Sequence, residues 1–166
     1  MEIHMAFIDF DGVILDTETN LFRKYKILKE RGVNITREQY LVEMNWYDWL
    51  EQANIINDSL EILRNNSSKI ATILTTIHSF NEGKMKVDYL RKNGVKNDVI
   101  VVPYICKKHD VVVPNGKLLV DDFGGNLSGW QANGGISIRF STNILKKYDD
   151  FEVVSNLQDV FDKHIG

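Results

Sequence analysis

The chain has 166 residues, of which 43% are hydrophobic and 26% charged, and this composition is typical of one globular domain with room for a small inserted subdomain. The formal net charge of -3 offers no general attraction to nucleic acid or to an anionic membrane, although a small phosphorylated ligand can still be bound locally. The single cysteine, Cys106, excludes an internal disulfide, and the N-terminus lacks the basic and apolar stretches of a signal peptide, so we expect a cytoplasmic protein.

Short apolar runs alternate with helical patterns along the chain, which predicts parallel strands joined by crossover helices in an α/β sheet. Strands are expected at residues 5–10, 69–74, 99–102, 118–120, 136–140 and 153–154. Core helices are expected at residues 82–93, 127–132 and 157–163. Gly94 marks the end of the first of these helices, and Ser155 is a candidate N-cap for the last.

The segment between Gly12 and Lys69 is much longer than one crossover helix requires. It contains helical patterns at residues 21–31, 37–43, 46–53 and 59–64. We therefore expect a small helical cap over residues 16–66, inserted after the first strand of a core that is formed by residues 1–15 and 67–166. The polar, turn-forming residues 65–68 are the expected return from the cap to the core.

The first predicted strand ends in two aspartates, Asp9 and Asp11, which are followed by Gly12. Because alternate residues of a strand share a face, the two carboxylates can point to the same side where the chain turns. Such a pair can supply a nucleophile, an acid–base group and metal ligands. An isolated Asp-x-Asp-Gly sequence is usually a solvated turn, so its position after an apolar strand is what favours a functional role.

A second pair of carboxylates, Asp121 and Asp122, follows the predicted strand at residues 118–120. Open α/β sheets bind their ligands at the carboxyl ends of the strands, so we expect the two acidic strand ends to converge on one site. Clustered carboxylates repel one another unless a cation neutralises them, and Mg²⁺ favours oxygen ligands of this kind. We therefore expect Mg²⁺ as the cofactor.

Two weaker signals lie between the acidic pairs. Thr75 and Thr76 follow an apolar run, where a hydroxyl can hold a phosphoryl oxygen or only satisfy a backbone group at the strand end. Lys107 and Lys108 precede the second acidic strand, and a lysine there can neutralise phosphate charge, although adjacent lysines are more often solvated in a loop. Of the two lysines, we expect Lys108 to be the site residue.

In this order, the four features resemble the motifs of the haloacid dehalogenase-like (HAD) phosphohydrolase superfamily, and the resemblance covers most of the chain. Residues 9–13 resemble the first motif, Thr75 the second-motif hydroxyl, Lys108 or Lys107 the motif lysine, and Asp121-Asp122 the acidic fourth motif. The resemblance implies a Rossmann-like parallel sheet sandwiched by helices.

Within the superfamily, residues 9–16, 73–75, 118–122 and 134–136 are similar to the 5'(3')-deoxyribonucleotidase branch, which hydrolyses nucleoside monophosphates. The chain departs from that branch in three places: residues 111–116 lengthen the segment between lysine and aspartate, Thr76-Ile77 replaces a common serine and proline, and the expected cap is short. The expected substrate is a nucleoside monophosphate or a similar small phosphorylated metabolite.

The resemblance also implies a mechanism. Asp9 attacks the substrate phosphorus and becomes an aspartyl-phosphate, while Asp11 protonates the leaving group and then activates water. Mg²⁺ is held by Asp9, by the backbone carbonyl of Asp11 and by Asp121, with Asp122 binding through water or orienting the site. The residues that hold the phosphoryl group are Thr75, Thr76 and Lys108.

Three alternatives stay open at this point. The substrate can be a sugar phosphate or another small metabolite, or the chain can be a non-catalytic phosphate- or metal-binding protein on the same fold. A receiver-like signalling domain also gathers aspartates, a threonine and a lysine around Mg²⁺. In receiver domains the acidic pair comes early, whereas here it comes late, so the order favours the hydrolase.

Other acidic and aromatic residues receive structural interpretations. Asp16 and Glu18 stand near the start of the first cap helix, where carboxylates stabilise a helix N-terminus. Trp46, Tyr47 and Trp49 can stack on a nucleobase, although aromatics at this spacing more often fill a core or an interface. A homodimer formed through these aromatics is a further hypothesis.

Overall fold

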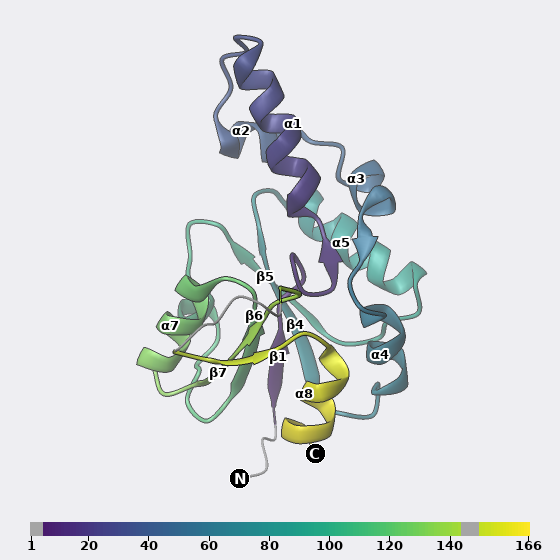
Figure 1. Cartoon of the computed structure of the whole chain (residues 1–166), viewed down its shortest axis with the longest axis vertical. Helices are drawn as coiled ribbons and strands as arrows, with labels where there is room; N and C mark the ends of the chain where they lie inside the picture. Colours follow the sequence, from purple (N-terminus) through teal and green to yellow (C-terminus); the bar gives the residue numbers. More distant parts are fainter. Residues whose placement is uncertain (1–4, 144–149) are drawn as a thin grey trace.

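The computed structural model describes residues 5–143 and 150–166, and its centre is a six-stranded parallel sheet with helices on both faces (Figure 1). The strands of this sheet are β1 (Ala6–Ile8), β4 (Ala71–Ile77), β5 (Val99–Pro103), β6 (Leu118–Asp121), β7 (Ile136–Phe140) and β8 (Glu152–Val154). Their order is β5-β4-β1-β6-β7-β8, and every neighbouring pair is parallel. The predicted α/β sandwich and its six strands are confirmed.

The central strand β1 is buried on both faces, as is typical of a parallel strand with helices above and below it. Phe7 points to one layer, where its ring meets that of Trp130 at a centroid distance of 5.5 Å. Ala6 and Ile8 belong to the other, larger apolar cluster. Burial on both faces explains why this strand is continuously apolar, and it leaves Asp9 as the first polar residue, at the strand's carboxyl end.

The helices that flank the sheet are α4 (Ser59–Asn65), α5 (Phe80–Lys92), α6 (Lys108–Val111), α7 (Gly124–Ala132) and α8 (Leu157–His164). The three predicted core helices are confirmed within a few residues, whereas the single turn α6 is too short to show a helical pattern. Helix α8 is capped by Asn156, whose side chain accepts a hydrogen bond from the Gln158 amide, so the prediction of Ser155 as N-cap is wrong. Among the described residues, no helix is long and apolar enough to cross a membrane.

The long segment after β1 forms a helical layer beyond the carboxyl ends of the strands (Figure 1). This layer contains α1 (Glu18–Glu30), α2 (Arg37–Glu43) and α3 (Trp46–Gln52), which match three of the predicted helical patterns. A short antiparallel ribbon of β2 (Leu15–Asp16) and β3 (Asn54–Ile55) connects it to the sheet. Helix α4 matches the fourth pattern and contacts α8. The division into a cap at residues 16–66 and a core stays a prediction.

The tryptophans of α3 hold the helical layer together. The indole N–H of Trp46 donates to the carbonyl of Leu41, and that of Trp49 donates to the carbonyl of Thr17, both at 2.9 Å. Both indoles are buried, whereas Tyr47 is exposed. The interpretation of the two tryptophans as core residues therefore agrees with the structure, and only Tyr47 of the three is available to a second copy of the chain.

Strand β4 runs to Ile77, three residues beyond the predicted end at residue 74. Thr75 and Thr76 therefore lie inside the strand rather than after it. Their β-branched side chains suit a strand, but a polar pair after an apolar run also has the appearance of a strand end. The consequence for the site is that Thr75 is completely buried, while Thr76 is only partly covered.

Trp130 offers a test of the sheet packing. Its side chain is completely buried against Phe7, and its indole N–H donates to the carbonyl of Lys117. We expect Trp130→Ala to lower the free energy of unfolding by about 3–5 kcal/mol because it leaves a cavity and an unpaired carbonyl. Urea denaturation measures this loss. Phe80→Ala, which truncates a highly exposed ring, is the control, and an equal loss in both variants would contradict the packing.

Candidate active site

The two acidic strand ends meet at one edge of the sheet. Strands β1 and β6 are parallel neighbours, and the Asp9 amide donates a hydrogen bond to the carbonyl of Val120 at 2.9 Å. Asp9, Asp121 and Asp122 each offer a carboxylate oxygen, and these three oxygens all lie within 4.8 Å of one another. The structure thus brings together three of the four aspartates that the sequence indicates, in a group that could hold a metal ion.

Lys108 joins two of these carboxylates. Its Nζ lies 2.7 Å from Asp9 Oδ1 and 2.7 Å from Asp121 Oδ2, and its side chain is buried. The single helical turn α6 places Lys108 on the inside, whereas the preceding Lys107 is exposed and borders the cavity described below. Of the two candidate lysines, the structure brings Lys108 into contact with the acidic residues.

Asp121 is completely buried and is held by further hydrogen bonds. The Phe123 amide donates to Oδ1 at 2.8 Å, and the Asn126 side-chain amide donates to Oδ2 at 2.9 Å. These donors come from the loop after β6 and from the first turn of α7. They fix the orientation of a carboxylate that the sequence identifies, although Asn126 itself carries no signal in the sequence.

Gly12 makes the approach of Asp122 to the turn after β1 possible. Its φ of +75° lies in the left-handed region, and a Cβ at this position would lie 2.1 Å from Asp122 Oδ2. Any other residue would therefore be strained and would also collide with the carboxylate. The glycine allows Asp122 to stand directly against the turn that carries Asp11.

The side chain of Asp11 has a separate set of partners. Its Oδ1 accepts a hydrogen bond from Thr17 Oγ1 at 2.7 Å, and its Oδ2 accepts one from Lys86 Nζ at 2.6 Å. Thr75 Oγ1 lies 3.4 Å from the same Oδ2. Among the described residues, Asp11 is outside the group of three carboxylates that could hold a metal, so its side chain is directed to a different role from that of Asp9.

Lys86 and Glu82 are residues of the site that the sequence analysis misses. They stand on α5 at positions i and i+4 with Nζ and Oε1 2.7 Å apart, and both side chains are buried. Opposite charges at this spacing normally indicate an exposed helix face. Nothing in the local pattern shows that this face of α5 points at the end of β1, so the sequence signal is misleading here.

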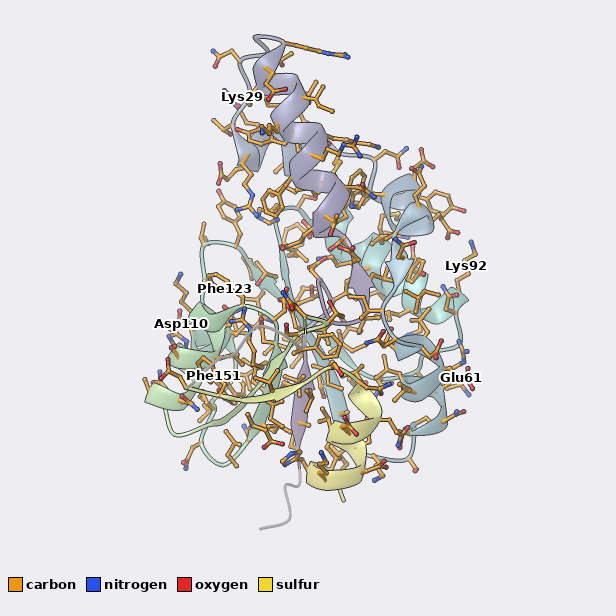
Figure 2. The ribbon with its side chains drawn as sticks, viewed as in Figure 1. Lys29, Glu61, Lys92, Asp110, Phe123 and Phe151 are labelled. Carbon is orange, nitrogen blue, oxygen red and sulfur yellow. The ribbon has the colours of Figure 1, made fainter. Side chains whose placement is uncertain are left out.

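A cavity of about 550 Å³ opens between the helical layer and the carboxyl ends of the strands. From the sheet side it is lined by Asp9, Asp11 and Asp122, and from the helical layer by Arg37 and Trp46. Phe123, on the loop between β6 and α7, also lines it, and Figure 2 shows this side chain above α7 at the ends of the strands. Further lining residues include Glu18, Thr76, His78, Tyr104 and Lys107.

Glu18 has a role in the site beyond the helix-start role that the sequence indicates for it and for Asp16. Asp16 behaves as a helix-start residue, because its Oδ1 accepts a hydrogen bond from the Thr19 amide at 3.2 Å. Glu18 lies in the first turn of α1 as expected, but it also lines the cavity. Burial raises the pKa of Glu18, and the charge of Asp11 adds to this effect. Glu18 therefore belongs to the electrostatics of the site.

The carboxylates of the site carry more negative charge than the neighbouring cations balance. Burial raises the pKa of Asp9 well above its ordinary value, and the charge of Asp121 adds to the rise while Lys108 opposes it. Burial, followed by the charges of Asp121, Glu18 and Asp11, raises the pKa of Asp122 to about 7. A divalent cation such as Mg²⁺ would stabilise the ionised forms of these carboxylates, and it prefers hard oxygen ligands of this kind.

Comparison with known proteins supports the fold. No protein-family model and no curated protein sequence matches the chain. Among solved structures, a Bacillus subtilis protein described as a HAD hydrolase and solved with bound magnesium superposes with a TM-score of 0.67 at 13% identity, over 98% of each chain. A HAD-like hydrolase from Streptococcus pneumoniae gives 0.65 at 14% identity, over 95% of this chain and 97% of that one.

The chain has the haloacid dehalogenase-like hydrolase fold. A HAD phosphatase from Thermococcus onnurineus also matches, with a TM-score of 0.58 at 16% identity, over 98% of this chain and 97% of that one. These likenesses agree with the superfamily that the sequence motifs resemble. They do not single out the deoxyribonucleotidase branch, since the similar structures are described as HAD hydrolases, phosphatases or a dehalogenase.

The charge imbalance predicts how stability depends on pH. The folded-state pKa of Asp122 lies above the value of about 3.9 expected in the unfolded chain, so the folded protein binds more protons between these pH values. Without divalent cations, we expect the free energy of unfolding to fall as the pH rises from about 4 through about 7. Saturating Mg²⁺ should offset the loss at the upper end, because the ion binds the ionised site.

Urea denaturation at several pH values, with Mg²⁺ and with a chelator, measures this dependence. Asp122→Asn is the matched control, because it removes one of the carboxylates whose pKa is raised and should make the pH dependence weaker, leaving the part that comes from Asp9 and Glu18. The charge imbalance would be contradicted if the free energy of unfolding of the wild type in chelator rose between pH 5 and 8 and Mg²⁺ had no effect on it.

The adjacent lysines provide a second test. Lys108→Met should lower the free energy of unfolding by about 3–5 kcal/mol in chelator, because it leaves the buried carboxylates of Asp9 and Asp121 without their cation. Lys107→Met should change it by less than about 0.5 kcal/mol because Lys107 is exposed. Urea denaturation of both variants measures these changes. Equal losses in the two variants would show that Lys108 does not offset the negative charge of Asp9 and Asp121.

Proposed function

We propose that this protein is a Mg²⁺-dependent phosphomonoesterase that acts through an aspartyl-phosphate on Asp9. The observation that supports this most is the position of Asp9, whose carboxylate contacts Lys108 and also lines the cavity. A nucleophile for phosphoryl transfer needs an open approach for the substrate and a nearby cation that offsets the negative charge of the phosphoryl group. Both conditions meet at this one carboxylate.

The first step would transfer the phosphoryl group to Asp9. A carboxylate oxygen of Asp9 bonds to phosphorus while the bond from phosphorus to the ester oxygen breaks, and Asp11 gives its proton to that oxygen. In the second step Asp11 takes a proton from water, the water oxygen bonds to phosphorus, and the bond to Asp9 breaks to release phosphate. Asp11 ends the cycle protonated, as it began.

The residues that would hold Mg²⁺ are Asp9, Asp121 and Asp122, together with the backbone carbonyl of Asp11. When bound, the ion supplies positive charge that stabilises the phosphoryl oxygens in the transition state. The three carboxylates suit this ion because they offer hard oxygen ligands within 4.8 Å of one another, and because burial and the neighbouring carboxylates raise the pKa values of Asp9 and Asp122.

We assign the phosphate-binding role to Lys108, Thr76 and Thr75. Lys108 carries the cation next to the nucleophile, and Thr76 lines the cavity. The buried hydroxyl of Thr75 lies 3.4 Å from Asp11 Oδ2, so its contribution would combine phosphate binding with support of the acid–base group. Lys107, at the edge of the same cavity, would meet the more distant part of a substrate.

The substrate class we propose is a nucleoside monophosphate or a similar small phosphorylated metabolite. The rings of His78 and Tyr104 stack at a centroid distance of 5.3 Å, and both residues line the cavity, as does Phe123. Aromatic faces of this kind suit a planar base. Arg37 adds a positive charge from the helical layer. A sugar phosphate would use the same chemistry but would leave the aromatic faces unoccupied.

Phosphate release from a panel of esters tests this proposal. The panel contains nucleoside monophosphates, sugar phosphates and p-nitrophenyl phosphate, each with Mg²⁺ and with a chelator. We expect Mg²⁺-dependent release, and we expect Asp9→Asn to lose at least about 10³-fold because an amide does not attack phosphorus. A folded Asp9→Asn variant with wild-type turnover would refute the nucleophile, and no release from any ester would favour a non-catalytic phosphate- or metal-binding protein.

A further inference from the structure

Lys86 is a second lysine buried in the candidate active site, and its side chain is completely inaccessible to solvent. Its Nζ donates to Asp11 Oδ2 at 2.6 Å, to Thr75 Oγ1 at 3.1 Å and to the carbonyl of Thr76 at 3.1 Å. It also lies 2.7 Å from Glu82 Oε1. An ammonium group has three hydrogens, so these four acceptors share all of them and fix the position of Nζ.

Glu82 anchors this lysine to the end of β4. Its other carboxylate oxygen, Oε2, accepts a hydrogen bond from the His78 amide at 2.7 Å, while its own amide donates to the N-cap Ser79. Glu82 is therefore bound at both carboxylate oxygens and at the backbone. The position of Lys86 is therefore tied to the hydrogen-bonded start of α5.

Aromatic rings enclose the lysine on its remaining sides. Its Nζ lies 5.3 Å from the ring centroid of Phe10 and 5.2 Å from that of Trp46. Phe10 belongs to the turn after β1, and Trp46 belongs to the helical layer. Lys86 thus lies behind the cavity wall. Among the described residues, it is not one of those that line the cavity.

Its location gives Lys86 a different task from Lys108. Lys108 contacts Asp9 and Asp121, whereas Lys86 contacts Asp11 and Glu82, so each lysine serves its own pair of carboxylates. Because Lys86 is behind the cavity, a substrate bound there would meet Asp11 and not Lys86. Any effect of Lys86 on the reaction must then pass through the residues that it contacts, and among these Asp11 is the acid–base group and accepts the shortest hydrogen bond.

We propose that Lys86, anchored by Glu82, is a positioning residue that binds Asp11 Oδ2 and so keeps the carboxylate at the cavity wall, in the orientation from which it serves the leaving group and water. This role rests on the proposed phosphatase function. It adds to that function a residue that acts through the acid–base group Asp11. Thr17 holds the second oxygen from the start of the helical layer, so Asp11 is fixed from both the sheet and the layer.

The test uses Lys86→Met, which retains a long apolar side chain against the two aromatic rings but removes the ammonium. Lys84→Met is the matched control, since Lys84 is on the same helix, is exposed and pairs with Asp88. Where Lys86→Met does not fold, the double variant Glu82→Gln, Lys86→Met removes the lysine without leaving the Glu82 carboxylate unpaired.

The readout is the rate of the first step, measured in single turnovers with two esters. An alkyl phosphate needs protonation of its leaving oxygen, whereas p-nitrophenyl phosphate leaves readily without it. We expect Lys86→Met to slow the alkyl ester about tenfold or more beyond its effect on the nitrophenyl ester. We also expect no additional loss on the alkyl ester when Lys86→Met is added to Asp11→Asn, because both changes remove the same contribution.

An equal slowing of both esters, or a full additional loss in the Asp11→Asn background, would overturn the positioning role. A wild type that releases phosphate from no ester would refute the proposed function instead. The inference keeps a test in that case: urea denaturation should show that Lys86→Met destabilises the Asp11→Asn variant much less than the wild type. Equal destabilisation would overturn the contact itself.

Discussion

Negative charge is concentrated at one edge of the sheet, and the placement of the side chains around the site follows from this concentration. Four aspartates gather there, namely Asp9, Asp11, Asp121 and Asp122. Buried like charges are unstable unless cations lie between them. Lys108 and Lys86 each stand between two carboxylates, and the described ion pairs leave Asp122 outside both arrangements, with a pKa of about 7. The remaining imbalance is what a divalent cation would correct.

The fold creates this concentration through topology. Strand β1 lies between β4 and β6, and all three run in the same direction, so the residues that follow each strand arrive at one edge. The strands themselves are buried on both faces and are therefore apolar, which confines polar chemistry to their ends. Gly12 then permits the close approach of Asp122 to the turn, and the helical layer covers the edge to leave a cavity of about 550 Å³.

Most of the fold, and the acidic residues of the site, could be predicted from local sequence. The buried strands appear as continuous apolar runs, and Asp9 and Asp121 follow such runs, so their convergence could be expected before the structure. Lys86 and Glu82 could not be found in this way, because an i, i+4 charge pair on an amphipathic helix is typical of solvent exposure. Only the three-dimensional packing of α5 against β4 shows that the pair is buried and that it reaches Asp11.

The role of Asp9 as nucleophile can be tested by asking whether it receives a phosphoryl group. We would incubate the protein with Mg²⁺ and acetyl phosphate, quench it in acid, and locate any modified residue by mass spectrometry of peptides. We expect one phosphoryl group on Asp9, formed only with Mg²⁺ and retained longer in an Asp11→Asn variant, because Asp11 activates water for the second step. A phosphoryl group on another residue, or none on Asp9 while the protein hydrolyses the donor, would contradict this role.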